Sequence, residues 1–214
     1  MTHSITDSLL SSNALIIAGT MAAAYLLASI NFAILACRLL HRVDPRTNGS
    51  GNPGATNLLR TWGPGPATIV LLLDVGRAFG LMFAAWTIPA CALWPVVALP
   101  ILTGNVFPVF HGFKGGKGVA TSCGILLALS PVSVGAGAIV FLLVFGITRR
   151  VSPASLALAL TTAVTMYVVD APLLYTLTAA SIFPILLATH RHNIARLLRG
   201  EEPRISIGAP TGKE

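Results

Sequence analysis

Acidic residues are scarce in this sequence of 214 residues. Seven Asp and Glu stand against 14 Lys and Arg, and the four charged types make up only 10% of the chain, whereas 54% is hydrophobic. Soluble domains carry about 25% charged residues, so this composition excludes an ordinary soluble domain. We expect one all-α integral-membrane domain that covers residues 1–214.

Catalytic carboxylates and metal motifs are missing as well. No histidine is followed by an aspartate at the spacing of the His-x4-Asp dyad, which many glycerolipid acyltransferases use, and neither a G-x-S-x-G elbow nor an HExxH motif occurs. The acidic residues expected on the cytoplasmic side are only Asp44, Glu201, Glu202 and Glu214. A paired-carboxylate or metal mechanism would need more of them, so we expect no metal and no cofactor.

The placement of the basic residues argues against a nucleic-acid partner. The formal net charge is +7, but the lysines and arginines form short clusters between apolar runs, without a contiguous basic face or interleaved aromatic residues. A membrane surface and an anionic substrate fit this pattern better.

Seven apolar runs predict the membrane spans. They cover residues 14–36, 67–88, 89–110, 119–130, 132–147, 154–169 and 173–189. A span takes about 20 residues, so two of these runs, 119–130 and 132–147, are short, and Pro131 between them predicts a tight hairpin. The sequence therefore predicts seven transmembrane helices, some of them short or broken.

The basic residues also predict the orientation of these spans. With the N-terminus outside, the inward connections hold 13 of the 14 Lys and Arg residues; the last one, Arg77, falls inside a span, and the outward segments hold none. The positive-inside rule then places the C-terminus in the cytoplasm. Every polar, glycine-rich stretch lies on that same cytoplasmic face.

One of these stretches, residues 107–121, combines Lys114 and Lys117 with four glycines. Glycine lets the backbone approach a ligand closely, so Gly115 and Gly116 between the lysines are typical of a phosphate cradle. A nucleotide P-loop is excluded, because the glycine-to-lysine spacing is one residue short, no Ser or Thr follows the lysine, and no strand precedes it. A basic interfacial turn between membrane helices explains the local pattern equally well.

A second polar stretch, residues 49–60, reads Gly-Ser-Gly-Asn-Pro-Gly-Ala-Thr-Asn-Leu-Leu-Arg. Glycines such as Gly54 can turn backbone N–H groups toward an anion, and Arg60 supplies a bidentate fork. The structural alternative is a helix capped by Thr56 or Asn52. We favour an anion site, because a cap needs only one such residue.

Two pairs of polar residues lie near the ends of later spans. Ser152 and Ser155 stand at the start of one span, where helix capping is favoured over ligand binding. His190 and Asn193 share one face at the cytoplasmic end of the last helix, either as interfacial anchors or as ligands of a substrate.

A third pair, Asp74 and Arg77, shares a face inside a span. Charges within a membrane are costly and are usually paired or functional. We favour a structural ion pair, with support of a nearby site as the alternative.

Three ordered blocks, residues 50–60, 107–121 and 190–200, together with the hydropathy profile of nearly the whole chain, resemble the bacterial acyl-phosphate:glycerol-3-phosphate acyltransferases. These are small polytopic enzymes that make lysophosphatidic acid. The resemblance implies seven helices with the three blocks at the cytoplasmic interface, no metal, glycerol 3-phosphate as acceptor, and a long-chain acyl phosphate instead of acyl-CoA as donor.

The resemblance also implies roles for individual residues. The candidate catalytic residues are His190, Asn193, Lys114 and Arg60, and the candidate substrate-binding residues are Ser50, Gly51, Asn52, Gly54, Thr56, Asn57, Gly115, Gly116, Lys117, Ser152 and Ser155. With so few carboxylates, His190 is the only candidate protein base, and it can equally orient the glycerol hydroxyls. We favour transfer in which the acyl phosphate itself takes the proton.

Some positions depart from the family pattern. Asn105 stands where a histidine is common, Arg77 and Ala78 replace a usual Lys-Gly pair, and Asn31 occupies a position that often holds proline. These departures spare the loop cations and the pair in the last helix, so they concern supporting residues and not the reaction.

Two other functional classes fit the sequence less well. An organic-phosphate transporter commonly carries broken midplane helices and internal repeats, whereas the polar motifs here gather at one interface. A lipid-binding scaffold would not need three separate polar blocks. We therefore expect a multi-pass enzyme of the bacterial inner membrane, in contact with membrane lipid and with its active site facing the cytoplasm; the sequence makes no prediction of oligomeric state.

Overall fold

The computed structural model describes residues 2–40, 43–89 and 94–205, with side chains from residue 13 onward. The chain is helical, and no strand occurs among these residues. The elements are α1 (Thr2–Ala28), α2 (Phe32–Leu40), η1 (Pro45–Thr47), α3 (Ala55–Thr61), α4 (Pro64–Trp86), η2 (Trp94–Val97), α5 (Ala98–Val106), η3 (Val109–His111), α6 (Val119–Leu129), α7 (Pro131–Thr148), α8 (Val151–Val168), α9 (Leu173–Thr189) and α10 (Arg191–Leu198).

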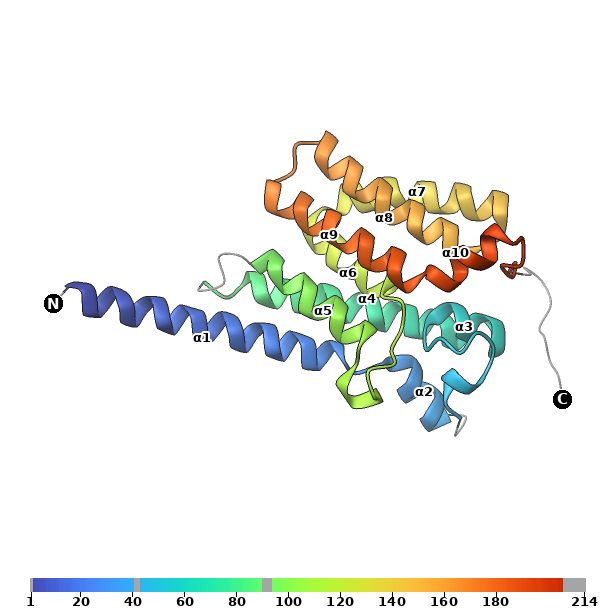
Figure 1. Cartoon of the computed structure of the whole chain (residues 1–214), viewed down its shortest axis with the longest axis horizontal. Helices are drawn as coiled ribbons and strands as arrows, with labels where there is room; N and C mark the ends of the chain where they lie inside the picture. Colours follow the sequence, from blue (N-terminus) through green and yellow to red (C-terminus); the bar gives the residue numbers. More distant parts are fainter. Residues whose placement is uncertain (1, 41–42, 90–93, 206–214) are drawn as a thin grey trace.

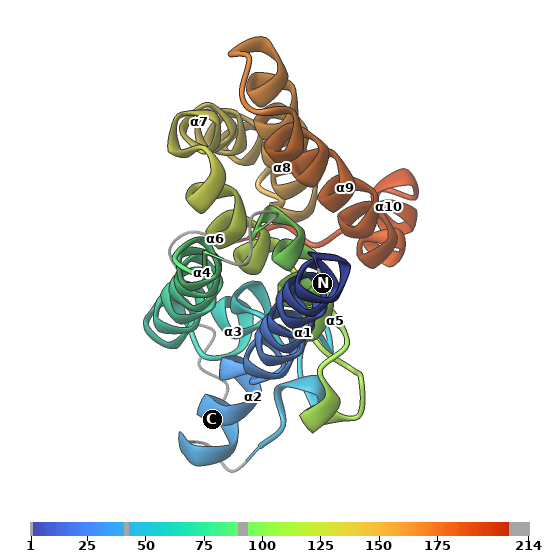
Figure 2. The ribbon, with the colours of Figure 1, turned by 90° about the vertical axis from the view of Figure 1, so that its left-hand side faces the viewer.

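The long helices run side by side along the longest axis of the molecule (Figure 1). Helices α7, α8 and α9 form one group and α1, α4 and α5 another, with α6 between them (Figure 2). The short helices α2, α3 and α10 gather at the end away from the N-terminus (Figure 1). This end collects the polar blocks that the sequence predicts on one face.

Small residues let the helices approach each other closely. A Cβ on Gly124 of α6 would lie 2.2 Å from the carbonyl oxygen of Val75 in α4, and one on Gly137 of α7 would lie 2.4 Å from Thr162 Oγ1 in α8. Close backbone approach through glycine is the usual way in which helices associate in lipid, where apolar burial supplies little driving force. The two groups of helices are therefore packed as membrane helices pack.

The outer surface of the long helices is apolar. Leu72, Ile139 and Leu142 are more than half exposed, whereas Met82, Ile101 and Ile125 are fully buried in the core. Five segments are long and apolar enough to cross a membrane, and a sixth is reached if α9 and α10, which meet at 63°, form one broken span. The five are Asn13–Leu40, Pro64–Trp86, Trp94–His111, Pro131–Thr148 and Val151–Val168.

Several predicted boundaries are confirmed. Helix α9 begins and ends where the sequence predicts, at Leu173 and Thr189. The hairpin at Pro131 is also present, because Ser130 ends α6 and caps α7, its side chain accepting a hydrogen bond from the Ser133 N–H. Helix α6 has only 11 residues, shorter than a full span, and part of the run at 89–110 falls outside the described residues.

The first predicted span, residues 14–36, differs from prediction because it is interrupted. Helix α1 ends at Ala28, and α2 starts at Phe32 with the Asn31 side chain accepting a hydrogen bond from the Ile34 N–H at 2.9 Å. Arg77 of α4 donates to the carbonyl oxygen of Ile30 in the gap. The break is thus stabilised by polar side chains that satisfy the freed backbone groups.

Candidate active site

The glycine-rich stretch before α3 is organised by Asn57. Its Oδ1 accepts hydrogen bonds from the Ser50 N–H at 2.8 Å and the Ser50 hydroxyl at 3.1 Å, and its Nδ2 donates to the carbonyl oxygens of Pro45 and Asn48. Gly49 has a positive φ of 60°, and a Cβ there would lie 2.4 Å from Asn57 Oδ1. The side chains of Asn57 and Ser50 therefore fix the conformation of this loop through their own hydrogen bonds.

The alternative of a helix capped by Thr56 or Asn52 is wrong. Gly54 occupies the cap position of α3, without a side-chain hydrogen bond. Asn52 Oδ1 is instead buried with no hydrogen-bond partner among the described residues. Asn52 and Thr56 both line a cavity, so their polar groups remain available to a ligand.

The glycines around the two lysines hold their loop against the end of α5. The Gly115 N–H donates to the Val106 carbonyl at 3.1 Å, and the Gly116 N–H donates to the Asn105 carbonyl at 3.2 Å. A Cβ on Gly115 would lie 2.1 Å from the Asn105 carbonyl oxygen, so a larger residue does not fit. These two amides satisfy the last carbonyls of α5 and are not directed at a ligand.

Lys117 joins a buried polar network between the two groups of helices. Its Nζ donates to Asn193 Oδ1. Asn193 Nδ2 in turn donates to the Ser152 hydroxyl at 2.8 Å and to Glu202 Oε1 at 2.6 Å. Residues from the second and third sequence blocks are thereby in direct contact.

Glu202 is a member of this network that the sequence analysis missed. Only 2% of the residue is exposed, and its carboxylate accepts hydrogen bonds from Ser152 at 2.6 Å and from Arg196 Nε at 2.8 Å. Burial alone would raise the pKa of Glu202, but the hydrogen bonds from Ser152, Asn193 and Arg196 outweigh it and lower the pKa. Glu202 therefore carries a negative charge beside Lys117.

The segment after α10 folds back to place Glu202. Arg150 Nε donates to the Glu202 carbonyl at 2.9 Å, and Arg60 donates to the Pro203 carbonyl at 3.4 Å. An acidic residue in a basic polar tail is ordinarily solvated, so little in the sequence indicates that Glu202 is buried.

The capping interpretation of Ser152 is wrong. Ser152 lies inside α8, where it donates a hydrogen bond to Glu202, and Arg150 has the cap position.

His190 lies at the corner between α9 and α10, outside both helices, and is 2% exposed. Its Nδ1 is 2.8 Å from the Leu186 carbonyl oxygen, which can only accept, so Nδ1 carries the proton. Burial lowers the pKa of His190 to about 4, and the charge of Lys117 acts in the same direction. At neutral pH the imidazole is therefore uncharged, with Nε2 left as an acceptor.

Lys117 is itself affected by its surroundings. Burial lowers its pKa to about 8; Glu202 opposes this shift, whereas Arg196 and Arg60 add to it. The ammonium group remains mostly charged at neutral pH but titrates far closer to neutrality than an ordinary lysine. Such a value is typical of a functional cation.

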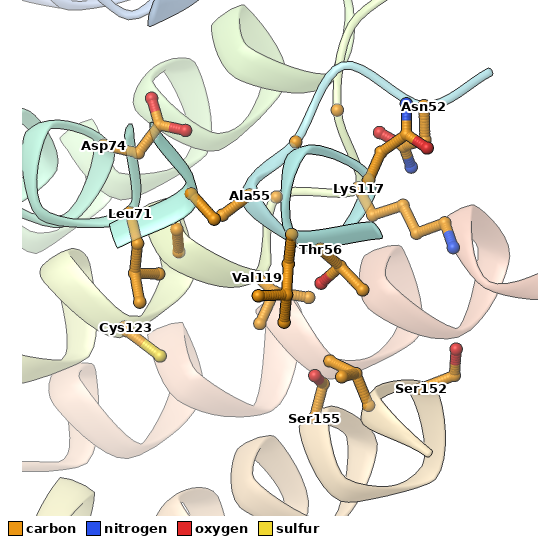
Figure 3. Close-up of a pocket in the computed structure, with 18 of the residues that line it drawn as sticks. Asn52, Ala55, Thr56, Leu71, Asp74, Lys117, Val119, Cys123, Ser152 and Ser155 are labelled. Atoms are coloured by element: carbon orange, nitrogen blue, oxygen red, sulfur yellow. The ribbon is translucent and has the colours of Figure 1, made fainter. Parts of the chain in front are cut away.

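A cavity of about 490 Å³ brings most of the predicted residues together. Figure 3 shows Lys117 and Asn52 at one end, facing Ser152 and Ser155 of α8, with Leu71 and Cys123 at the other end. Ser155 Oγ is buried without a hydrogen-bond partner among the described residues. The predicted residues that line the cavity are Ser50, Asn52, Gly54, Thr56, Asn57, Arg60, Gly116, Lys117, Ser152, Ser155, His190 and Asn193.

Three predicted residues lie outside this lining. Gly51 turns the loop with a positive φ of 71°, and its N–H donates to the Asn48 carbonyl. Gly115 and Lys114 line a second cavity, and the Lys114 residue is exposed. Lys117 lines both cavities, whereas Lys114 lines only the second one, so the two lysines do not meet on the central cavity.

The predicted ion pair inside α4 is confirmed. Arg77 lies 3.0 Å from Asp74, and both side chains are less than 10% exposed. Arg77 also stacks on the ring of Phe32, 5.0 Å from its centroid, and Asp74 lines the cavity at its apolar end. The pair therefore connects the break in the first span to the wall of the site.

The central cavity is amphipathic. Its polar end holds Lys117, and Arg60 and His190 also belong to the lining. Leu71 and Cys123 lie at the opposite end, and Phe141 and Leu142 add further apolar surface to the lining. In the described part of the chain, no group of three or more His, Cys, Asp or Glu is placed to hold a metal ion. The arrangement suits a ligand with an anionic head and a long apolar chain.

The model of the glycerol-3-phosphate acyltransferase family matches residues 18–200, most of the chain. The chain belongs to the glycerol-3-phosphate acyltransferase family. The prediction of an acyltransferase is thereby confirmed, and the residues that line the central cavity lie within the matched residues.

Individual relatives agree with this assignment. The glycerol-3-phosphate acyltransferase of Thioalkalivibrio sulfidiphilus is 43% identical over 183 residues, which cover 85% of this chain and 90% of that protein. The enzyme of the same name from Bordetella pertussis is 42% identical over 207 residues, 92% of this chain and 94% of that one.

Solved structures show the same fold. The crystal structure of PlsY (YgiH), an integral membrane glycerol 3-phosphate acyltransferase, in its glycerol 3-phosphate form has a TM-score of 0.83 and 35% identity, and covers 89% of this chain and 96% of that one. The lysophosphatidic acid form has a TM-score of 0.81 at 33% identity. With its long apolar helices, this chain is therefore a multi-pass membrane protein.

Proposed function

We propose that this protein transfers a long-chain acyl group from an acyl phosphate to glycerol 3-phosphate, giving 1-acyl-glycerol 3-phosphate and inorganic phosphate. The observation that carries the proposal is the amphipathic central cavity, which is lined by the cations Lys117 and Arg60 and by apolar side chains such as Leu71, Phe141 and Leu142. The apolar end accommodates the acyl chain, and the cations bind phosphate. This reaction is the first acylation in bacterial phospholipid synthesis.

Glycerol 3-phosphate is the acceptor in this proposal because similar proteins bind it. One PlsY crystal structure is the glycerol 3-phosphate form and another is the lysophosphatidic acid form, which correspond to an acceptor and its acylated product. In this chain, Asn52 Oδ1 and Ser155 Oγ are buried polar atoms without partners among the described residues, and both residues line the central cavity. They are the groups we assign to the substrate hydroxyls and head group.

The transfer step follows from the charges at the polar end. A glycerol hydroxyl oxygen attacks the acyl carbonyl carbon, the bond from that carbon to the phosphate oxygen breaks, and the departing phosphate takes the hydroxyl proton. Lys117 and Arg60 stabilise the charge on the phosphate and on the carbonyl oxygen. His190, neutral at pH 7 with Nε2 as acceptor, and Asn193 orient the attacking hydroxyl.

The orientation in the membrane belongs to the same proposal. Counting the short helix α6 with the five long segments and α9 gives seven crossings, and 13 of the 14 Lys and Arg residues then lie on the cytoplasmic side. The cavity would then open at the cytoplasmic face of the inner membrane. Single cysteines at Ser8 and Gly208, in a background without Cys37, Cys91 and Cys123, should then be labelled from opposite sides.

The decisive experiment supplies purified protein with palmitoyl phosphate and glycerol 3-phosphate and measures phosphate release and lysophosphatidate. We expect both products in equal amounts. Palmitoyl-CoA is the matched donor control and should give neither free coenzyme A nor lysophosphatidate. Turnover with palmitoyl-CoA and none with palmitoyl phosphate would refute the donor assignment.

A further inference from the structure

A second cavity lies on the far side of the glycine-rich loop. It has a volume of about 590 Å³ and is bounded by this loop on one side and by α9 and the start of α10 on the other. Asn52, Gly116 and Lys117 contribute to both cavities, so the loop backbone forms a shared wall. The remaining lining differs from that of the central cavity.

Two cations of this second cavity lack acidic partners. Lys114 and Arg191 both line it, and both are exposed. Neither forms an ion pair with any described residue, whereas Arg196 of α10 pairs with Glu202, and Arg199, which directly follows α10, pairs with Glu201. No acidic residue appears in the cavity's described lining, so its electrostatic potential favours an anion.

The rest of the lining is apolar and open. Phe107 and Phe113 are 52% and 57% exposed, and Pro184, Ile185 and Ala188 contribute the face of α9. Exposed aromatic rings next to lysine and arginine at the ends of membrane helices belong at the bilayer interface. A soluble anion would use the two cations but would leave these rings uncovered.

We propose that this second cavity binds the head group of an anionic bilayer phospholipid. Lys114 and Arg191 contact the lipid phosphate, and Phe107 and Phe113 contact the upper part of its acyl chains. Basic pockets between membrane helices commonly take such head groups. A lipid in this position contacts the side of the glycine-rich loop that faces away from the central cavity, because Gly116 and Lys117 form the wall between the two cavities.

The first test removes one of the cations. The full chain is placed in nanodiscs of phosphatidylcholine with increasing phosphatidylglycerol, and retained lipid is counted by native mass spectrometry. Wild type should retain one phosphatidylglycerol molecule, and Arg191→Gln should retain it about fivefold more weakly, the effect of one cation near a lipid surface. Arg199→Gln, which removes an exposed cation at the C-terminal end of α10 and outside the cavity lining, should behave as wild type.

The second test fills the cavity without changing charge. Ala188→Trp should reduce retention of phosphatidylglycerol, because Ala188 lines the cavity, whereas Leu187→Trp on the neighbouring exposed position should not. Helical circular dichroism checks that each variant is folded. The readout needs no turnover, so it is independent of the proposed reaction.

Three results would overturn the proposal. They are equal retention by Arg191→Gln and Arg199→Gln, equal retention of phosphatidylcholine and phosphatidylglycerol by wild type, and displacement of phosphatidylglycerol by millimolar inorganic phosphate. The last result would mean that the cavity takes a free phosphate instead of a lipid.

Discussion

Lys114 and Lys117 lie three residues apart on one loop, and yet only Lys117 lines the central cavity. Lys117 is partly buried and donates to Asn193, whereas Lys114 is exposed and lines the second cavity. The backbone between them is held by the end of α5 through the amides of Gly115 and Gly116. A shared motif therefore does not imply a shared role.

The largest expected effect separates the two lysines directly. Lys117→Ala should lower kcat/KM for glycerol 3-phosphate by about 2–5 kcal/mol in transition-state free energy, because it removes a desolvated cation from a phosphate. Lys114→Ala should cost far less, since its side chain does not line the central cavity. Steady-state kinetics on both variants make the comparison, and equal losses would show that both lysines act in one site.

The next effect concerns Glu202, the buried carboxylate beside Lys117. Glu202→Ala should lower the free energy of unfolding by about 1–3 kcal/mol, because Ser152, Asn193 and Arg196 lose a buried acceptor. Glu201→Ala is the matched control; its exposed pair with Arg199 should be worth less than about 1 kcal/mol. Unfolding is followed by circular dichroism in detergent, and equal shifts for the two variants would contradict the buried role of Glu202.

A smaller effect comes from the titration of Lys117. Because burial lowers its pKa to about 8, its positive charge is present below that pH and is lost above it. We expect kcat/KM to fall above pH 8 by up to about tenfold per pH unit. Lys117→Arg should abolish this decline and Lys114→Arg should keep it; an unchanged decline in Lys117→Arg would assign it to another group.

The smallest effect concerns the histidine beside Lys117. His190→Gln keeps a hydrogen-bonding side chain and should cost about 1 kcal/mol in activation free energy, with turnover still measurable. Neither protein should show a change of rate near pH 6.5, because the pKa of His190 lies near 4. A wild-type change near pH 6.5 that disappears in His190→Gln, with no residual turnover, would make His190 the base.

The fold was largely readable from hydropathy, but not its interruptions. The runs at 132–147 and 173–189 correspond to α7 and α9 within a residue. An apolar stretch in lipid is helical because its backbone N–H and C=O groups must bond to each other. The break between α1 and α2 was not predicted. It depends on Asn31 and on Arg77, a residue 46 positions beyond Asn31 whose contact with Ile30 exists only in the folded chain.

The candidate site was also predictable only in part from the sequence. Residue types and spacing singled out Arg60, Lys117, His190 and Asn193, and the structure places all four on the central cavity. Spacing could not show that Gly115 packs against α5, nor that the hydroxyl of Ser152 meets Glu202. Those contacts join segments that are distant in sequence.

Composition and hydropathy were enough to assign a helical membrane protein with three polar blocks, because an apolar segment in lipid must satisfy its own backbone hydrogen bonds. The folded chain was needed to show that Lys117 lines the central cavity and Lys114 does not, and that Glu202 is buried among Ser152, Asn193 and Arg196. The physical reason is that the free energy of a buried charge depends on partners that folding brings within hydrogen-bonding distance. No local pattern encodes those partners.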